Sequence, residues 1–389
     1  MNGGPLDGVR VVDASAGAVG PWAGSLLAQM GARVIKLESP QGDFIRNIMP
    51  TQRGLSTTYL SMNYGKLGLE LDMKEPQARA TAHRLITGAD VFIENFRPGV
   101  ADRIGLGWSE LSALNSRLVY ASASGFGWSG PMVKIGATDP HIQAFSGSTS
   151  VNGRPGGHRQ RVRWYGHFDV NTSLCIVQGV LAALLDRQRS GRGRLVRITM
   201  VEAAMALQRV RIGEHLSGGR PRPMGTGITY LAPDRAFEAL DGLVVVTAAS
   251  QAQWRRLCVA LERPDLADDP RFADNPARLR NRDALEAALG EVIATRSCGF
   301  WLRVLGRARV PCARPGGFDD FRQNVHFRDA GLLQRVETPH WGSLWAPGTP
   351  WRFARHPAAL GPPPAPGEHT KEILSRGWQA GDPDGEAAR

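Results

Sequence analysis

The chain has 389 residues, of which 42% are hydrophobic and 21% charged, enough for two globular domains with buried cores. Its net charge of +11 would suit a nucleic acid, but the cations are scattered and no nucleic-acid-binding motif accompanies them, so we expect an anionic small molecule and no nucleic-acid partner. No apolar run approaches the roughly eighteen residues of a membrane span and the N-terminal residues lack a signal-peptide core, so we expect a cytoplasmic protein with no membrane partner.

The four cysteines, Cys175, Cys258, Cys298 and Cys312, are far apart in the sequence and follow no metal-ligand spacing. The pattern therefore predicts neither a disulfide framework nor a metal site. We expect the cysteines to be small core residues.

The N-terminal part of the chain predicts a strand, a helix and a second strand. Residues 9–14 (VRVVDA) and 33–37 (RVIKL) have the composition of strands, and 22–30 form the expected helix between them. Such a crossover builds parallel sheets. The glycine-rich bend at 17–24 lacks the GxGxxG spacing of a dinucleotide site, so by itself it is weak evidence for a phosphate loop.

The same alternation continues to residue 124. We expect strands at 67–73, 90–96 and 118–124, and a helix at 76–87. The pattern predicts a large domain of the doubly wound, Rossmann-like α/β class.

The stretch from residue 164 to 204 is the most distinctive of the chain. Asp169 opens a segment that predicts a buried helix, because apolar residues lie on nearly every side of it: Leu174, Ile176, Val177, Val180, Leu181, Leu184 and Leu185. A basic turn at 186–194, a strand at 195–200 and a helix at 201–207 are expected next. A carboxylate at a helix start is either a cap for the first N–H groups or a reactive group, and the pattern alone favours the cap.

The second half of the chain predicts a smaller domain. Residues 213–230 are rich in Gly, Pro and Arg and indicate a linker between a large domain at 1–212 and a small α+β domain at 231–330. In the small domain we expect a hairpin at 236–249, turning at Asp241-Gly242, and helices at 251–261, 283–295 and 299–305. Residues 331–389 should return to the large domain with short strands, and the tail after Gly377 should be disordered.

The residues after Asp169, in the pattern GxLAALxxRxxSGRGxxVxxxMxEAA, resemble the core signature of the class III CoA-transferases, the family of formyl-CoA transferase, carnitine CoA-transferase and the α-methylacyl-CoA racemases. Three further segments resemble the same family: PLDGVRVVD with the GPWAG helix, MNYGKLGLELDMK (62–74) and ENFRPGVADRIG (94–105). The resemblance extends from Pro5 to about Leu374.

The resemblance implies CoA transfer from an acyl-CoA to a carboxylic acid, without a metal, in an interlocked homodimer. The aspartate matching Asp169 is the family's nucleophile, forming an aspartyl-CoA thioester. The family's CoA contacts match the following positions, although Ala18 and Ser39 differ from the glutamine and arginine of formyl-CoA transferase: Ala18, Ser39, Asn63, Lys66, Asn95, Phe96, Arg97 and Arg103.

The resemblance also places an acyl pocket around Thr138, His167, Gly225 and Gly227, with the two glycines in a loop over the site. Before Asp139 the transferases have Tyr and the racemases have a catalytic His, whereas this chain has Thr138. A threonine hydroxyl does not titrate near neutral pH, so it cannot serve as one of the two acid/base groups that racemisation needs. We therefore rank CoA transfer first, racemisation or other acyl-CoA chemistry second, and a CoA-binding protein with little catalysis third.

Overall fold

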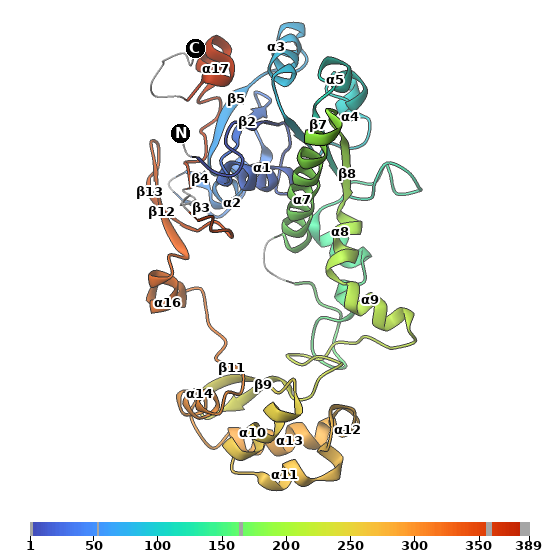
Figure 1. The fold of residues 1–389 in the computed structure, drawn as a ribbon, viewed down its shortest axis with the longest axis vertical. Helices are drawn as coiled ribbons and strands as arrows, with labels where there is room; N and C mark the ends of the chain where they lie inside the picture. Colours follow the sequence, from blue (N-terminus) through green and yellow to red (C-terminus); the bar gives the residue numbers. More distant parts are fainter. Residues whose placement is uncertain (1–2, 53, 163–165, 355–359, 382–389) are drawn as a thin grey trace. The chain divides into compact units, whose positions relative to one another are not determined.

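The computed structural model describes residues 3–52, 54–162, 166–354 and 360–381 (Figure 1). The chain forms two units. The large unit contains Met1–Ser146, Arg163–Arg209 and Val325–Arg389, and the small unit contains Gly147–Val162 and Val210–Asn324. The sequence did not indicate that residues 147–162 join the small unit. The expected linker is also shorter than 213–230 at its start, because a helix, α9 (Arg209–Leu216), continues through residue 216.

Six parallel strands form the central sheet of the large unit, in the order β5-β2-β1-β6-β7-β8. Their bounds are β1 (Arg10–Asp13), β2 (Arg33–Glu38), β5 (Lys66–Glu70), β6 (Val91–Glu94), β7 (Val119–Ser124) and β8 (Leu195–Thr199). This is the strand order of doubly wound dinucleotide-binding sheets, in which ligands bind where the order reverses, here at the carboxyl ends of β1 and β6. The expected Rossmann-like α/β class is confirmed.

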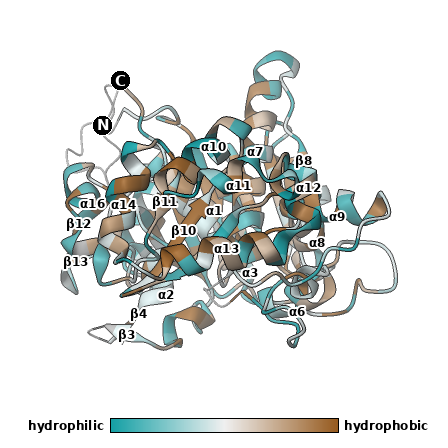
Figure 2. Ribbon diagram, turned by 90° about the horizontal axis from the view of Figure 1, so that it is seen from below, coloured by the Kyte–Doolittle hydropathy of each residue, from teal (hydrophilic) through white to brown (hydrophobic). Residues whose placement is uncertain are grey.

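Alternate residues of each strand face two different helical layers. Val11, Val91 and Val119 pack in a core with α1 (Val19–Gln29) and α7 (His167–Ser190). Val12, Phe92 and Tyr120 pack in a second core on the other face. The other helices of the large unit are α2 (Thr57–Met62), α3 (Pro76–Thr87), α4 (Val100–Arg103), α5 (Trp108–Leu114), α6 (Asp139–Phe145), α8 (Met200–Leu207), α16 (Val325–Asp329) and α17 (Thr370–Arg376). Brown and teal segments alternate along the helices in Figure 2, as expected for helices that bury one face.

Helix α7 is the long core helix that the pattern after Asp169 predicts. It is less completely buried than expected, because Leu185 is 62% exposed while Ile176, Val177 and Val180 are buried. The helix ends at Ser190, and the left-handed φ of 70° at the next residue, Gly191, closes the last turn. By length and composition α7 could cross a membrane, contrary to our reading of the sequence, but core helices of soluble proteins pass the same test. Trp164 and Tyr165, which precede it, lie outside the described residues.

The C-terminal segment returns to the large unit, as the sequence predicts. It forms a hairpin of β12 (Leu333–Thr338) and β13 (Gly342–Pro347), and then runs beside β5, where Gly65 donates to Gly361 and His369 donates to Gly68. The expectation of a disordered tail after Gly377 is wrong as far as residue 381. A 3-10 turn at Gly377–Gln379 is followed by the fully buried Ala380, and the Trp378 indole donates to the carbonyl of Leu85 at 2.9 Å. The short elements of the large unit are η1 (Phe44–Asn47), β3 (Thr51–Gln52) and β4 (Leu55–Ser56).

The small unit is a three-stranded antiparallel sheet covered by helices. The hairpin of β9 (Asp234–Ala239) and β10 (Gly242–Thr247) has Ala239 opposite Gly242, so its turn is Leu240-Asp241, one residue before the expected position. Trp254, Phe272 and Leu289 are among its core residues. Its other elements are η2 (Ser148–Ser150), α10 (Gln251–Ala260), α11 (Pro264–Asp268), η3 (Pro270–Phe272), α12 (Asn275–Arg280), α13 (Arg282–Ile293), α14 (Cys298–Arg307), β11 (Cys312–Ala313) and α15 (Asp320–Gln323).

Candidate active site

The loops after β1 and β6 meet at the point where the strand order reverses. The Asn95 side chain, which follows β6, joins them: its amide group donates to the Ala16 carbonyl at 2.7 Å, and its oxygen accepts from the Ala16 N–H at 2.9 Å. Asn95 was predicted as a CoA contact. In this structure its amide is bonded to the protein, and it aligns the two loops that border the predicted ligand position.

Asp169 lies in the first turn of α7 but does not cap it. The cap position belongs to Gly166, which has a left-handed φ of 62°, and the Asp169 side chain makes no capping hydrogen bond. Among the described residues, its carboxylate has no hydrogen-bond donor or cationic partner. Burial, and next the charge of Asp139, raise the pKa of Asp169 to about 7. A half-buried carboxylate that has neither a hydrogen-bond donor nor a cation beside it does not stabilise the surrounding structure. Such a carboxylate is typical of a functional site.

Asp139 performs the capping that Asp169 does not. It is 5% exposed and lies at the start of α6, where one of its oxygens accepts from the Phe168 N–H at 2.5 Å. The other oxygen accepts from the Gln143 amide at 2.6 Å. A residue distant in the sequence therefore satisfies the first turn of α7, and Asp169 remains available for chemistry.

A serine one turn after Asp169 ties α7 to the start of α1. The Ser173 hydroxyl contacts the carbonyl oxygen of Val19 at 2.6 Å and that of Asp169 at 2.9 Å. Val19 is the first residue of α1, the helix that follows β1. This contact brings the Asp169 turn to the end of the sheet where the strand order reverses. The sequence pattern did not single out Ser173, because a serine inside an apolar helix has no distinctive signal.

Besides Asn95, which is half-buried, the predicted CoA-contact residues differ in their exposure. Ser39, Arg97 and Arg103 are exposed, and the two guanidinium groups have no ion pair among the described residues. Phe96 is half-buried against the second core. The remaining ones, Ala18, Asn63 and Lys66, are buried, and the roles of all these residues in CoA binding stay predictions.

Lys66 and Asn63 have all their polar groups bonded within the protein. The Lys66 ammonium donates to Asp13 at 2.7 Å, to the Pro21 carbonyl at 2.6 Å and to Asn63 at 2.8 Å. Its side chain has no exposed surface. Asn63 in turn donates to the carbonyl of Tyr59. In this structure the two residues act beneath the surface rather than on it.

A cavity of about 310 Å³ opens beside Ser39 in the large unit. Its lining includes the Ser39–Gly42 turn, Arg46, Trp341 and Gly367. The volume lies at the lower end of the range of small-molecule sites. The cavity gives the predicted Ser39 contact room for part of a ligand.

The residues predicted for the acyl pocket belong to different units, the first two to the large unit and the two glycines to the small unit. Thr138 is exposed and its hydroxyl lies 2.8 Å from Nδ1 of His141. His167 begins α7, and burial lowers the pKa of its ring. Gly225 and Gly227 belong to the small unit, where Gly225 donates to the Gly153 carbonyl at 2.9 Å and Gly227 donates to Met224. Their placement over the acyl pocket stays a prediction.

Glu94 is a titratable group that the sequence analysis left without a role. It ends β6 at 4% exposure, accepts from the Phe96 N–H at 2.8 Å and contacts the Ser122 hydroxyl. Burial raises its pKa to about 7. The sequence could have indicated Glu94, because it is an acidic residue at the end of an apolar strand and directly precedes Asn95.

Parallel strands with a reversal of order and an unpartnered carboxylate at that end define a ligand-binding α/β enzyme. The profile of the family described as CoA-transferase family III matches residues 6–370. The chain is 36% identical over 310 residues to the acetyl-CoA:oxalate CoA-transferase of Acetobacter aceti, covering 79% of this chain and 80% of that protein. It is 33% identical over 383 residues to the succinyl-CoA:mesaconate CoA-transferase of Haloarcula hispanica, covering 95% and 96%.

Solved structures resemble the fold over nearly the whole chain. The crystal structure of Rv3272 from Mycobacterium tuberculosis superimposes with a TM-score of 0.85 at 32% identity, covering 95% of this chain and 98% of that one. A CaiB/BaiF family protein from Brucella suis gives 0.83 at 30% identity, covering 96% and 99%. The chain belongs to CoA-transferase family III, and it is an enzyme that transfers CoA from an acyl-CoA to an acid.

Proposed function

We propose that the transfer proceeds through an aspartyl-CoA thioester on Asp169. The observation that carries the proposal is the isolation of this carboxylate: it lies in the first turn of α7, lacks a bonding partner among the described residues, and has a pKa raised to about 7 by burial. A carboxylate that is paired with a cation would be a poorer nucleophile, because its charge would already be stabilised. With a pKa of about 7, the Asp169 carboxyl group would lose its proton near neutral pH, which makes it available as a nucleophile.

The chemistry balances without a metal or an external energy source. The ionised Asp169 carboxylate attacks the thioester carbonyl of the donor, the C–S bond breaks, and a mixed anhydride and CoA thiolate form. The thiolate attacks the aspartyl carbonyl and releases the donor acid, leaving the aspartyl-CoA thioester. The acceptor carboxylate attacks this thioester, and the expelled thiolate then attacks the acceptor's acyl carbon, which regenerates Asp169.

Asp169→Asn tests the proposal. The amide has nearly the same shape, and because Asp139 and Gly166 provide the start of α7, folding should be unaffected. We expect transfer to fall by about three orders of magnitude or more. In the wild type, hydroxylamine added after a donor acyl-CoA should modify Asp169, as located by peptide mass. Full activity of the variant, or a label on another residue, would contradict the mechanism.

For the substrates we propose short dicarboxylic acids as the first acceptors to test. The related transferases of Acetobacter aceti and Haloarcula hispanica carry oxalate and mesaconate in their names. Pairs of acyl-CoA donors and such acids, followed by mass spectrometry of the products, identify the preferred pair. A preference for monocarboxylic acids would contradict this assignment and leave the Asp169 mechanism intact.

We also propose that the protein works as a homodimer. Large apolar side chains of α8 are exposed in the single chain, with Met205 and Leu207 both about half exposed. Such side chains suit a subunit contact. Light scattering of the purified protein measures the mass directly, and a monomer at micromolar concentration would contradict the proposal.

A further inference from the structure

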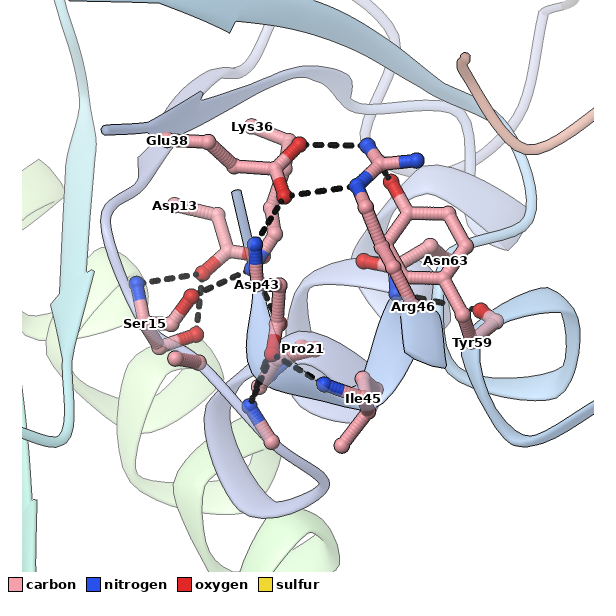
Figure 3. Close-up of polar contacts among 12 residues, drawn as sticks. Asp13, Ser15, Pro21, Lys36, Glu38, Asp43, Ile45, Arg46, Tyr59 and Asn63 are labelled. Carbon is pink, nitrogen blue, oxygen red and sulfur yellow. Dashed lines mark hydrogen bonds and ion pairs between the residues drawn. The ribbon is translucent and has the colours of Figure 1, made fainter. Parts of the chain in front are cut away.

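A balanced set of six charged side chains is buried around the carboxyl ends of β1 and β2, in the segment that follows β2, and at the start of β5. Its members are Asp13, Lys36, Glu38, Asp43, Arg46 and Lys66, and each is 9% exposed or less. Figure 3 shows most of them as one continuous network. Three carboxylates face three cations, so the network carries no net charge. Buried charges are expensive to desolvate and are kept where their geometry serves a purpose.

The inner part of the network fixes the turn after β1. Asp43 accepts from the Gly17 N–H at 3.0 and 3.1 Å, and it pairs with Lys36 at 3.1 Å. Lys36 also donates to the Ser15 carbonyl. Asp13, held by Lys66, accepts from the Ser15 N–H at 3.1 Å. Gly17 has a φ of 79°, which a glycine adopts without strain, and the contact with Asp43 holds its N–H in place.

The N–H groups of residues 14–17 are all bonded within the protein. Those of Ser15 and Gly17 bond to the network, that of Ala16 bonds to Asn95, and that of Ala14 bonds to the Ile93 carbonyl at 2.9 Å. A phosphate-binding loop, by contrast, directs free N–H groups at its ligand. Residues 14–17 therefore contribute to ligand binding through their backbone conformation. The buried charges determine that conformation.

The outer part of the network holds a different segment. Arg46 pairs with Glu38 at 2.5 Å and donates to the Pro364 carbonyl at 3.2 Å. The Tyr59 hydroxyl reaches the same carbonyl at 3.3 Å. These contacts secure the C-terminal segment, which lies beside β5 and away from the reversal of strand order.

We propose that Lys36 and Asp43 are positioning residues for CoA binding. They do not touch CoA; they hold Ser15 and Gly17 in the conformation that accepts it where the strand order reverses. The carboxylates of Asp13, Asp43 and Glu38 outweigh the effect of burial and raise the pKa of Lys36, so it stays charged over the working range of pH. Lys36 also cancels carboxylate charge that would otherwise repel the phosphates of CoA.

The test is the dissociation constant for CoA, measured by calorimetry on the full-length protein. Lys36→Met removes the cation and keeps the chain length, and we expect the dissociation constant to rise about tenfold or more. If this variant does not fold, Lys36→Met with Asp43→Leu removes the pair as one neutral unit and is expected to show the same rise. A constant within about twofold of the wild type, in either folded variant, overturns the proposal.

Arg187→Met is the matched control, because it removes a cation of the large unit that pairs with Asp90 at 2.8 Å, at the end of the sheet opposite to the turn. We expect its melting temperature to fall while its dissociation constant for CoA stays within about twofold of the wild type. An equal loss of CoA affinity in Arg187→Met would show a general effect of destabilisation and would overturn the assignment to Lys36 and Asp43. The measurement does not involve the Asp169 intermediate, so either proposal can fail alone.

Discussion

The carboxylate of Asp139 accepts a hydrogen bond of 2.5 Å from the backbone N–H of Phe168, the residue directly before Asp169. Asp139 thereby orients the first turn of α7 and also places a second negative charge near the proposed nucleophile. Burial is the largest cause of the raised pKa of Asp169, and Asp139 is the next. One buried residue thus influences both the position and the ionisation of the proposed nucleophile.

The activity of the wild type should decrease at low pH, because Asp169 is protonated there. Asp169 must lose its proton to attack, and its pKa is raised to about 7. We expect kcat/KM to fall as the pH is lowered through about 7, with a slope of one proton. A flat profile between about pH 5 and 8 would mean that the attacking group does not ionise there.

Asp139→Asn should move this dependence to lower pH. The asparagine oxygen can still accept from Phe168 N–H, and Gln143 can turn its amide to match, but the negative charge is gone. The pKa of Asp169 then decreases, because only burial raises it. We expect the acid limb of kcat/KM to shift by roughly half a pH unit or more. An unmoved limb in an active variant would remove Asp139 from the ionisation of Asp169.

Replacing Asp169 should not weaken the fold at alkaline pH. Its pKa is about 7 in the folded protein against 3.8 ordinarily, so the folded state holds the proton more tightly. The ionisation of Asp169 therefore lowers the free energy of unfolding of the wild type as the pH rises from about 4 to about 7. The Asp169→Asn variant lacks this contribution. At pH 8 the variant should have a free energy of unfolding equal to the wild type's or higher by roughly 1–3 kcal/mol. Urea unfolding at about pH 4.5 and 8 measures this, and lower stability of the variant at pH 8 would contradict it.

Gly166→Ala should damage activity more than its backbone strain explains. A Cβ at residue 166 would lie 3.1 Å from Oδ2 of Asp169 and would displace the carboxylate. Gly191→Ala is the matched control at the other end of the same helix, because Gly191 has a similar φ of 70° and open space around its Cβ position. Each variant should lose about 1 kcal/mol of stability, but only Gly166→Ala should lower kcat, by about tenfold or more. Equal activities would place Asp169 away from the chemistry.

Arg103→Ala should weaken CoA binding. Arg103 is exposed at the end of α4, shortly after β6, and it has no ion pair among the described residues. A guanidinium in that position suits a phosphate group of CoA, and its loss should raise the dissociation constant about five- to tenfold. Arg189→Ala, which removes an exposed arginine at the far end of α7, should leave the constant unchanged. Calorimetry compares the two, and an unchanged constant in Arg103→Ala would remove this residue from the site.

The fold class and the family could be predicted from the sequence because both depend on local signals. Apolar runs of strand length between helical segments predicted each strand of the central sheet, and the motif after Asp169 identified the family. Boundaries were less accurate: α1 begins at Val19, three residues before the expected start, because Pro21 is tolerated in a first helical turn.

Two results depended on the tertiary structure. From the sequence, Asp169 could be either a helix cap or a nucleophile. The tertiary structure showed that a different residue, Asp139, accepts the hydrogen bond from the first turn of α7. Similarly, Asn63 and Lys66 resembled surface contacts for CoA, whereas the fold buries them beneath the turn with Asp13. The sequence by itself determined which residues are present and which segments are regular. Which polar groups are already bonded was decided only by tertiary packing, because residues such as Asp139 and Phe168 meet across 29 positions of the chain.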